Sequence, residues 1–233
     1  MLEIITPRNA HRKQALLTAM QRMRYEVTRG VMGWNVPYAP SVPQGLDRDE
    51  FDRDDTLYLV VTGEGGAVLG CARLNQTTGP HMLSEVFADC CNLQGVRRDP
   101  RVFEFSRYII DPGACGSKLA FFRTMATLEL AINVACLNAG ATAVTWLAEQ
   151  RMYARSCKAW RTEPLGLPTY FEDDDQTYVA ALSVMDAQGL AKAASLYRFG
   201  DDDLAALRRT VGPVSDAMAE AIRGAEAPDR QAA

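Results

Sequence analysis

Apolar residues recur along the chain with helical spacing in some segments and strand spacing in others. A short strand is expected at residues 2–5, and then a helix whose apolar stripe follows the helical period: Leu16, Met20, Met23 and Val27. Asn9 precedes this stripe as a candidate helix cap. Residues 30–50 hold six glycines and prolines, which break regular structure and predict a long loop of a kind that is often functional.

The middle of the chain reads as three strands followed by a long helix. Apolar runs at residues 56–61 and 67–74 flank a glycine-rich turn and predict a hairpin. A longer strand is expected at residues 102–110, where aromatic and branched residues dominate. Ser117 is then placed to cap a helix that runs to Asn138.

The remaining elements complete an alternation of helices and strands. A strand at residues 143–147, a helix from about residue 149 and a strand at residues 177–185 are expected. This order predicts an α/β fold with a mixed central sheet flanked by helices. We assign residues 1–185 to this domain, and residues 186–233 to a C-terminal helical extension of it with a frayed tail. Alanine-rich segments predict the helices of the extension, at residues 187–197, 201–210 and 214–224.

Composition limits the class of protein. The chain has 233 residues, 48% of them hydrophobic and 23% charged, which fits one globular domain with a full core. Its net charge of −4 argues against a general nucleic-acid binder, which would carry a basic surface. Apolar runs fall short of the roughly 18 residues of a membrane span, and the N-terminal run is too short for a signal peptide.

Cysteine and histidine usage indicates no metal site. The six cysteines lack C-x-x-C spacing and the chain has two histidines, so no metal-ligand set can be read. The cysteines lie mostly in apolar or small-residue stretches, which indicates buried, reduced thiols rather than redox chemistry. We therefore expect a cytoplasmic protein.

Three charged side chains interrupt strands that otherwise read as buried: Arg73, Glu104 and Arg107. Isolated buried charges are too costly to leave unpaired, so partners are expected. The nearest candidates are Asp52, Asp55 and Arg24, which would let three cations face three anions. Two interpretations stay open: a polar pocket in the sheet that holds a charged substrate and positions a base, or charges on a solvent-facing side of the sheet.

Strand geometry sets a condition on the pocket interpretation. In a regular strand Glu104 and Arg107 point to opposite faces, because successive side chains alternate. A shared pocket therefore requires a bulge or a twist between them.

Taken in order, these residues resemble the LuxI-type acyl-homoserine lactone synthases. The matching positions are an arginine late in the first helix, a loop tryptophan, an aspartate pair, a strand arginine and a Glu-x-x-Arg motif: Arg24, Trp34, Asp52 with Asp55, Arg73, and Glu104 with Arg107. Phe87 matches the family aromatic, and the resemblance spans roughly residues 1–185. No single motif is decisive, but the ordered set is fairly specific.

Two departures concern the loop after the first helix. Thr28 stands where the family has a phenylalanine, and the segment from Trp34 to Asp52 is longer than usual. This proline-punctuated segment is similar to that of the subgroup that takes branched or aromatic acyl groups from coenzyme A instead of acyl carrier protein.

The resemblance implies a fold and a reaction. The fold is the GNAT-like N-acyltransferase fold, in which a splayed or bulged central strand exposes backbone donors near the thioester carbonyl. In the reaction, the amine of S-adenosylmethionine attacks an acyl thioester of coenzyme A or acyl carrier protein, and lactone closure expels methylthioadenosine. Both compounds are substrates, and neither a permanently bound cofactor nor a metal is expected.

The resemblance also assigns roles to residues. The candidate catalytic residues are Glu104, Ser106 and Arg107. Glu104 is the expected general base or water holder, because the amine must lose a proton; a structural partnership with Arg107 is the alternative. Backbone amides at Ser106 to Tyr108 are expected to polarise the thioester carbonyl.

The S-adenosylmethionine pocket is assigned to six residues: Arg24, Trp34, Asp52, Asp55, Arg73 and Phe87. The aspartates, with Arg73, are expected to shape and charge the pocket rather than to perform chemistry. Ordinary turn acids are the alternative for the two aspartates. Packing onto the core is the alternative for the two aromatic residues.

Two further groups concern the acyl donor. Thr145 and Trp146 lie where the family builds its acyl pocket, and strand alternation lets only one of them point inward. A tryptophan there favours short or branched acyl chains, and a packed core strand is the alternative. Arg151, Arg155 and Lys158 recur at helical spacing and form either a docking face for an acidic carrier protein or coenzyme A phosphates, or a solvated helix face.

Two rival functions remain at this point. A GNAT-type N-acetyltransferase acting on another amine would share the fold, but would show a fuller glycine-rich pyrophosphate loop than the turn from Gly113 to Ser117. A non-catalytic protein on this scaffold would bind S-adenosylmethionine without releasing methylthioadenosine.

Overall fold

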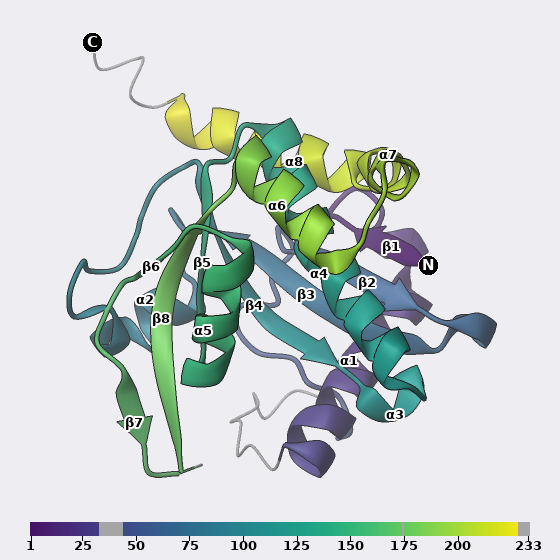
Figure 1. Ribbon diagram of the computed structural model, residues 1–233, viewed down its shortest axis with the longest axis horizontal. Helices are drawn as coiled ribbons and strands as arrows, with labels where there is room; N and C mark the ends of the chain where they lie inside the picture. The colour runs from purple at the N-terminus through teal and green to yellow at the C-terminus, as the bar shows by residue number, and fades with distance from the viewer. Residues whose placement is uncertain (33–43, 174, 228–233) are drawn as a thin grey trace.

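A single mixed sheet organises the protein (Figure 1). The computed structural model describes residues 1–32, 44–173 and 175–227. Within these ranges eight strands run in the order β1-β2-β3-β4-β5-β8-β6, and β7 also pairs with β8. They are β1 (Leu2–Ile5), β2 (Leu57–Thr62), β3 (Val68–Gln76), β4 (Val102–Ile110), β5 (Ala143–Glu149), β6 (Thr162–Pro164), β7 (Thr169–Phe171) and β8 (Gln176–Val184). The β4–β5 pair is parallel and the other pairs are antiparallel, as the α/β assignment with a mixed sheet requires.

Helices cover both faces of the sheet. The α-helices are α1 (Gln14–Tyr25), α2 (Met82–Glu85), α3 (Pro112–Cys115), α4 (Lys118–Ala139), α5 (Gln150–Ala159), α6 (Ala187–Tyr197), α7 (Asp201–Thr210) and α8 (Gly212–Glu226). Three short 3₁₀ helices are η1 (Ala10–Arg12), η3 (Glu64–Gly66) and η4 (Ala88–Cys91), and the π-helix η2 (Glu26–Val31) continues α1.

The long helix α4 forms the centre of the main core. It packs with Leu74 and Phe103 of the sheet, and buried residues of α6, α7 and α8 join the same cluster. This packing supports our proposal that the C-terminal helices extend the same domain; residues 228–233 of the expected frayed tail lie outside the described residues.

α4 is long and apolar enough to cross a membrane, but more than half of its apolar segment is buried. The length of α4 agrees with the expected helix, but the expectation that no segment reaches the length of a membrane span considered uninterrupted apolar runs, and Arg123 and Glu129 interrupt this one.

The opposite face of the sheet carries two smaller apolar clusters. One joins Met20 and Met23 of α1 to Cys71 and Ile109, and the other includes Leu83 of α2. All six cysteines are free thiols and five of them are buried, which agrees with the expected reduced state. Side chains alternate between the two faces along β3 and β4. Leu74 and Phe103 face α4, so the residues next to them in each strand point to this second face.

Strand β4 contains the bulge that the pocket interpretation required. Cys71 pairs with Ile109 and Arg73 with Ser106, so Arg107 and Tyr108 together oppose one residue of β3. Arg107 adopts a φ of 48°, a left-handed conformation that few non-glycine residues take. The extra residue brings Arg107 back to the face that also carries Glu104.

Strands β4 and β5 separate after a short parallel ladder. They pair only from Val102 to Glu104 on β4 and from Ala143 to Thr145 on β5, although both strands continue. Figure 1 shows them diverging below this point. The part of β4 beyond Glu104 therefore has an edge that β5 does not cover, as expected for a splayed central strand.

Most long elements begin and end within a few residues of their expected bounds. The first helix is an exception: it begins at Gln14, and the Asn9 side chain caps no helix, because its carboxamide oxygen accepts the N–H of the preceding Thr6 at 2.8 Å. Four short elements were not expected: α2, α3, β6 and β7. Each has three or four residues, too few for a periodic signal.

Candidate functional site

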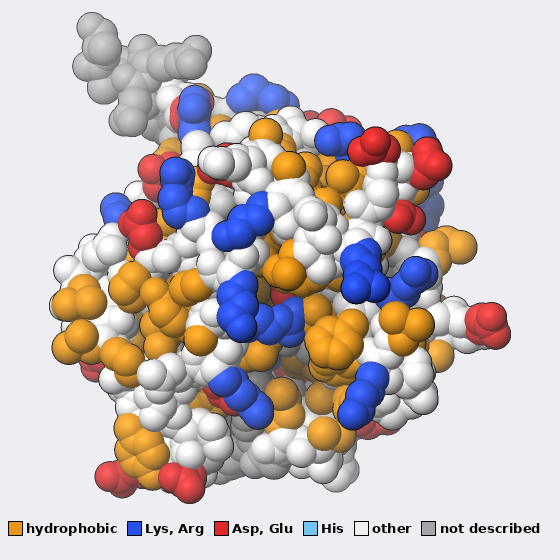
Figure 2. Space-filling model, in the orientation of Figure 1, with side chains coloured by type: hydrophobic (Ala, Val, Ile, Leu, Met, Phe, Trp, Pro, Cys, Tyr) orange, Lys and Arg blue, Asp and Glu red, His pale blue; other side chains and the backbone are white. Residues whose placement is uncertain are grey.

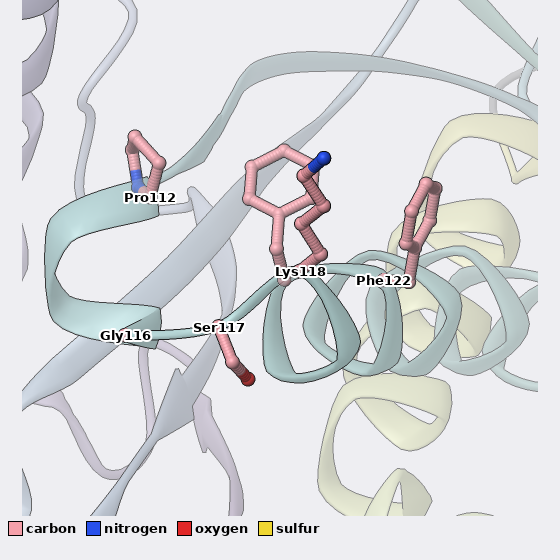
Figure 3. Close-up of a pocket in the computed structure, with 6 residues that line it drawn as sticks. Pro112, Gly116, Ser117, Lys118 and Phe122 are labelled. Carbon is pink, nitrogen blue, oxygen red and sulfur yellow. The ribbon is translucent and has the colours of Figure 1, made fainter.

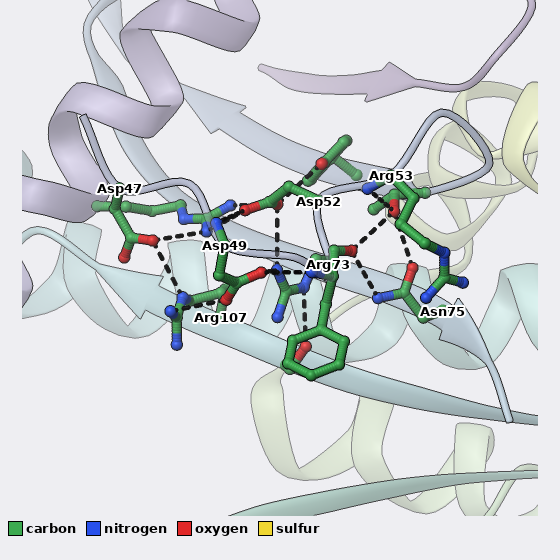
Figure 4. A network of polar contacts seen from close by, with 12 residues as sticks. Asp47, Asp49, Asp52, Arg53, Arg73, Asn75 and Arg107 are labelled. Carbon is green, nitrogen blue, oxygen red and sulfur yellow. Dashed lines mark hydrogen bonds and ion pairs between the residues drawn. The ribbon is translucent and has the colours of Figure 1, made fainter. Parts of the chain in front are cut away.

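Three arginines and three aspartates meet in a buried ionic network on the second face of the sheet (Figure 4). We call these residues the arginine–aspartate cluster: Arg24, Arg73, Arg107, Asp47, Asp49 and Asp52. Arg24 donates to both Asp52 oxygens at 3.0 and 2.9 Å and to Asp47 at 2.9 Å. The cluster is balanced in formal charge, which makes its burial tolerable.

The remaining ion pairs connect the loop to strands β3 and β4. Arg73 pairs with Asp49 and, at 3.2 Å, with Asp52. Arg107 pairs with Asp47 at 3.2 Å and with Asp49 at 2.8 Å. The loop before β2 is therefore tied to the sheet by charge rather than by regular structure.

The expectation of three cations facing three anions is confirmed, but two of the anions differ from those expected. Asp47 and Asp49 take the places that we assigned to Asp55 and Glu104. The side chain of Asp55 is 70% exposed and pairs with Arg53 at 2.9 Å, because the turn before β2 directs it to solvent. The missed signal was the closely spaced aspartates within the long loop, which has no periodicity to mark buried positions.

The ionic contacts fix the charge states of the cluster. Burial alone would raise the pKa of Asp52, but Arg24 and Arg73 outweigh burial and hold it well below its ordinary value. The Tyr58 hydroxyl donates to Asp52 at 2.8 Å, and burial together with this carboxylate raises the tyrosine pKa. Four buried polar atoms of the cluster have no hydrogen-bond partner among the described residues: Arg24 Nε, Arg73 Nη2, Asp47 Oδ2 and Asp49 Oδ2, although the last is in an ion pair with Arg107.

Glu104 occupies a separate place on the same face. Its two oxygens accept the backbone N–H groups of Met82 at 3.0 Å and Leu83 at 2.7 Å, the first residues of α2. Its partners are thus these amides, whereas Arg107 binds the loop aspartates. The side chain is 1% exposed, and burial raises the pKa of its carboxyl group. A raised pKa makes a carboxylate a better proton acceptor near neutral pH.

Ser106 and the bulge lie beside Glu104 on β4. The Ser106 hydroxyl oxygen accepts a hydrogen bond from Arg73 Nε at 3.0 Å, so the Ser106 side chain borders the arginine–aspartate cluster. The following residues form the bulge at the point where β4 and β5 have separated. The structure therefore brings Glu104, Ser106 and Arg107 together at the start of the splay.

Thr145 and Trp146 point to opposite faces, as alternation required. Thr145 is the register partner of Glu104; its hydroxyl oxygen is buried without a described hydrogen-bond partner. Trp146 lies in the main core, where its indole N–H donates to Ser183 at 3.0 Å. It borders a cavity of about 40 Å³ whose other walls are Phe105, Glu129, Ile132, Val144, Ser156, Trp160, Ser183 and Met185.

The three basic residues of α5 differ in their surroundings. Arg151 is exposed and pairs with Glu149, and Lys158 is exposed. Arg155 is partly buried and reaches Glu129 of α4 at 3.6 Å. Figure 2 shows Lys and Arg side chains over α5 and along α4 on this face, with apolar side chains between them.

The start of α4 borders a second, open cavity (Figure 3). It has a volume of about 520 Å³ and is lined by Pro112, Gly116, Ser117, Lys118, Phe121 and Phe122. The Ser117 hydroxyl oxygen accepts the Ala120 N–H at 3.1 Å, so it caps the helix as expected. The first turn of a long helix carries partial positive charge, and Lys118 adds a full one.

Two aromatic candidates remain. Phe87 packs edge-on against Phe171 of β7, with ring centroids 6.0 Å apart, which supports the core-packing alternative. Trp34 lies outside the described residues.

Comparison with known proteins identifies a family whose model matches most of the chain. The family model described as autoinducer synthase matches residues 8–190. An acyl-homoserine-lactone synthase of Ralstonia solanacearum is 41% identical over 98 residues, 41% of this chain and 46% of that protein, so the match spans about half of the relative. An isovaleryl-homoserine lactone synthase of Bradyrhizobium diazoefficiens is 30% identical over 174 residues, 74% of this chain and 75% of that protein.

Solved structures show the same fold. BjaI, a CoA-dependent acyl-homoserine lactone synthase solved with S-adenosylmethionine and isopentyl-CoA, superposes with a TM-score of 0.75 at 27% identity, covering 90% of this chain and 99% of that one. TofI, solved with an inhibitor and methylthioadenosine, has a TM-score of 0.61 at 28% identity, covering 77% and 90%.

Proposed function

The chain belongs to the autoinducer synthase family, and from this premise we propose that it makes an N-acyl-homoserine lactone, a diffusible quorum-sensing signal. Its substrates are S-adenosylmethionine and an acyl thioester, and its second product is methylthioadenosine. The observation that carries the proposal is the position of Glu104. It is a buried carboxylate held by two backbone amides at the last paired residue before β4 and β5 separate.

The arginine–aspartate cluster supports binding of a zwitterionic substrate. The methionine part of S-adenosylmethionine carries an ammonium and a carboxylate, and the cluster retains an unpartnered donor, Arg73 Nη2, and an unpartnered acceptor, Asp47 Oδ2. A charged ligand that pairs with such buried atoms recovers the free energy lost when they are desolvated. Asp52 and Arg24 then set the shape and charge of this pocket, whereas Asp55 is too exposed to share in it.

The chemistry follows from these positions. Glu104 accepts a proton from the amine directly or through a water molecule, and the amine nitrogen then bonds to the thioester carbonyl carbon. Backbone N–H groups near Ser106 and the Arg107 bulge stabilise the oxyanion. The carbon–sulfur bond of the thioester breaks, and the substrate carboxylate then closes the lactone and expels methylthioadenosine.

A coenzyme A thioester is the donor that the observations favour. The open cavity at the start of α4, with Lys118 at its edge, offers positive charge to phosphates. The exposed Arg151 and Lys158 lie on the neighbouring helix. BjaI, which superposes on 90% of this chain, is CoA-dependent. An acyl carrier protein is the alternative donor for the same basic face.

The acyl group is expected to be short or branched. The cavity beside Trp146 is about 40 Å³, and Phe105 and Trp160 are among its walls. The hydrogen bond from the indole to Ser183 fixes Trp146 in this position.

Product analysis tests the proposal. The purified chain is incubated with S-adenosylmethionine and either acyl-CoA or acyl carrier protein thioesters, and lactones are sought by mass spectrometry. Lactone from the coenzyme A pool supports the whole proposal, and lactone from the carrier-protein pool alone overturns the donor assignment. Thioester consumption with a different acylated amine would instead indicate a general N-acetyltransferase.

A further inference from the structure

A buried histidine precedes the helix that holds Glu104. His81 is fully buried, and its Nδ1 lies 2.9 Å from the carbonyl oxygen of Gly79. A carbonyl oxygen only accepts, so in the neutral ring Nδ1 carries the hydrogen and Nε2 keeps an electron pair. Nε2 is buried and has no hydrogen-bond partner among the described residues. A buried acceptor without a partner is unfavourable, so its presence calls for a functional reason.

The imidazole is coupled to Glu104 through α2. The two residues that follow His81 donate their backbone N–H groups to the Glu104 carboxylate. The imidazole is also close enough for its charge to oppose the effect of burial on the pKa of Glu104. The Thr145 hydroxyl, beside Glu104 on β5, is a second buried polar group without a described partner.

The other ionisable groups that interact with Glu104 do not change their protonation near neutral pH. Arg73 stays a cation, because Asp52 and Asp49 outweigh burial and raise its pKa. The thiol of Cys91 on η4 stays neutral, because burial raises its pKa to about 11. Neither can take up a proton during turnover.

The Ser84 hydroxyl also contacts the ring: it lies 3.1 Å from Nδ1 and donates to the carbonyl oxygen of His81 at 2.9 Å. Glu85, later on α2, is exposed and engaged by Ser84 and Arg98. Arg53 donates to the carbonyl oxygen of Pro80. Imidazole is the side chain whose ordinary protonation lies closest to neutral pH.

We propose that His81 is a positioning residue that acts through Glu104 by holding the proton which leaves the substrate amine. This inference rests on the proposed function. One proton moves from the ammonium to a Glu104 oxygen and then to His81 Nε2. As the nitrogen bonds to the carbonyl carbon, a second proton goes to the departing sulfur, which leaves as a thiol. The third stays on the amide, and His81 returns its proton to solvent after turnover.

Two amide variants separate the ring nitrogens. His81→Asn keeps a donor near Nδ1 and removes Nε2, whereas His81→Gln keeps a polar group near Nε2 that cannot be protonated. We expect both to lower kcat at least tenfold, a modest share of a typical general-base effect, with the KM for S-adenosylmethionine changed less than about twofold. The exposed His11, the other histidine of the chain, provides the control variant His11→Asn.

The pH profile distinguishes this role from a structural one. In the wild type, kcat/KM should fall below neutral pH with the slope of two protons, one each for Glu104 and His81, and both variants should retain a one-proton slope. An unchanged slope in folded, active variants overturns the inference while leaving lactone synthesis intact. Absence of lactone from the wild type would instead overturn the proposed function.

Nuclear magnetic resonance of ¹⁵N-labelled histidine gives a test that does not need turnover. The two histidine signals are assigned by loss of one of them in His81→Gln. We expect His81 in the free protein to show an unprotonated Nε2 at neutral pH and to change its protonation when S-adenosylmethionine binds, while His11 does not. A His81 ring that is protonated throughout, or unaffected by S-adenosylmethionine, contradicts the proposal.

Discussion

Arg73 Nε lies 3.0 Å from the Ser106 hydroxyl oxygen, which joins the arginine–aspartate cluster directly to the strand that carries Glu104. The two polar systems on this face of the sheet are therefore one structure. The cluster holds the loop before β2 and the bulge of β4, and the bulge lies in the part of β4 that no longer pairs with β5. Changes in the cluster should consequently affect both stability and turnover.

Removal of Asp52 should be strongly destabilising. Asp52→Asn leaves Arg24 and Arg73 buried with fewer anionic partners, and breaking a buried ion pair in this way costs about 3–5 kcal/mol. Asp55→Asn is the matched control, because its side chain is 70% exposed and surface changes stay within about 0.5 kcal/mol. Urea unfolding of both variants measures the difference. Equal losses would mean that the network contributes little to stability.

The contribution of Asp52 should decline in acid. Its pKa is lowered on folding, so its stabilising effect is complete above the pKa of the unfolded chain, about 4, and declines as the pH falls below that value. The difference in unfolding free energy between the wild type and Asp52→Asn should therefore shrink from pH 6 to pH 3. A difference that stays constant over this range would show that the carboxylate charge is not what stabilises the fold.

Glu104→Gln should fold but lose most turnover. Glutamine still accepts a backbone N–H with its amide oxygen, whereas it cannot accept the amine proton, and loss of a general base costs roughly 10²–10⁴ in rate. Glu85→Gln, on the exposed side of the same short helix, is the control and should retain activity. Near-normal turnover of Glu104→Gln would remove this residue from the mechanism.

Charge reversal on α5 should weaken donor binding alone. Arg151→Glu with Lys158→Glu is expected to raise the KM for the acyl donor several-fold and leave the KM for S-adenosylmethionine unchanged, because both side chains are exposed on one helix. Arg155 is not a suitable site, because its contact with Glu129 would confound the result. Arg209→Glu, on α7, is the control. A donor KM equal to that of the control would mean that α5 has only a solvated surface.

The acyl preference should depend on the Trp146 indole. Trp146→Leu enlarges the cavity beside Phe105 and should shift kcat/KM toward longer acyl chains. Ser183→Ala keeps the indole but removes its hydrogen bond, together with the 2.9 Å contact between the Ser183 and Thr162 hydroxyls, and should give a smaller shift in the same direction. Competition between short and long acyl thioesters measures the ratio. The same preference in all three proteins would exclude this cavity as the acyl pocket.

The sequence predicted more of the fold than of the site. The bounds of β1 and β4 followed from their apolar patterns and those of α6 and α7 from alanine-rich composition, and the alternation of Glu104 and Arg107 required the bulge that the structure contains. Asp47 and Asp49 could not be identified in advance, because a loop gives no signal of which acids become buried. Their partners lie on strands distant in the sequence. His81 was missed for a similar reason, since its burial depends on the four-residue helix α2.

The most direct test of the central claim is the stoichiometry of one reaction. The purified chain is incubated with isotopically labelled S-adenosylmethionine and a short branched acyl-CoA, and lactone, methylthioadenosine and free thiol are quantified together by mass spectrometry. We expect the three products in equal amounts, with the label in the lactone and in methylthioadenosine. Thiol release without labelled lactone, or S-adenosylmethionine recovered intact, would contradict the account.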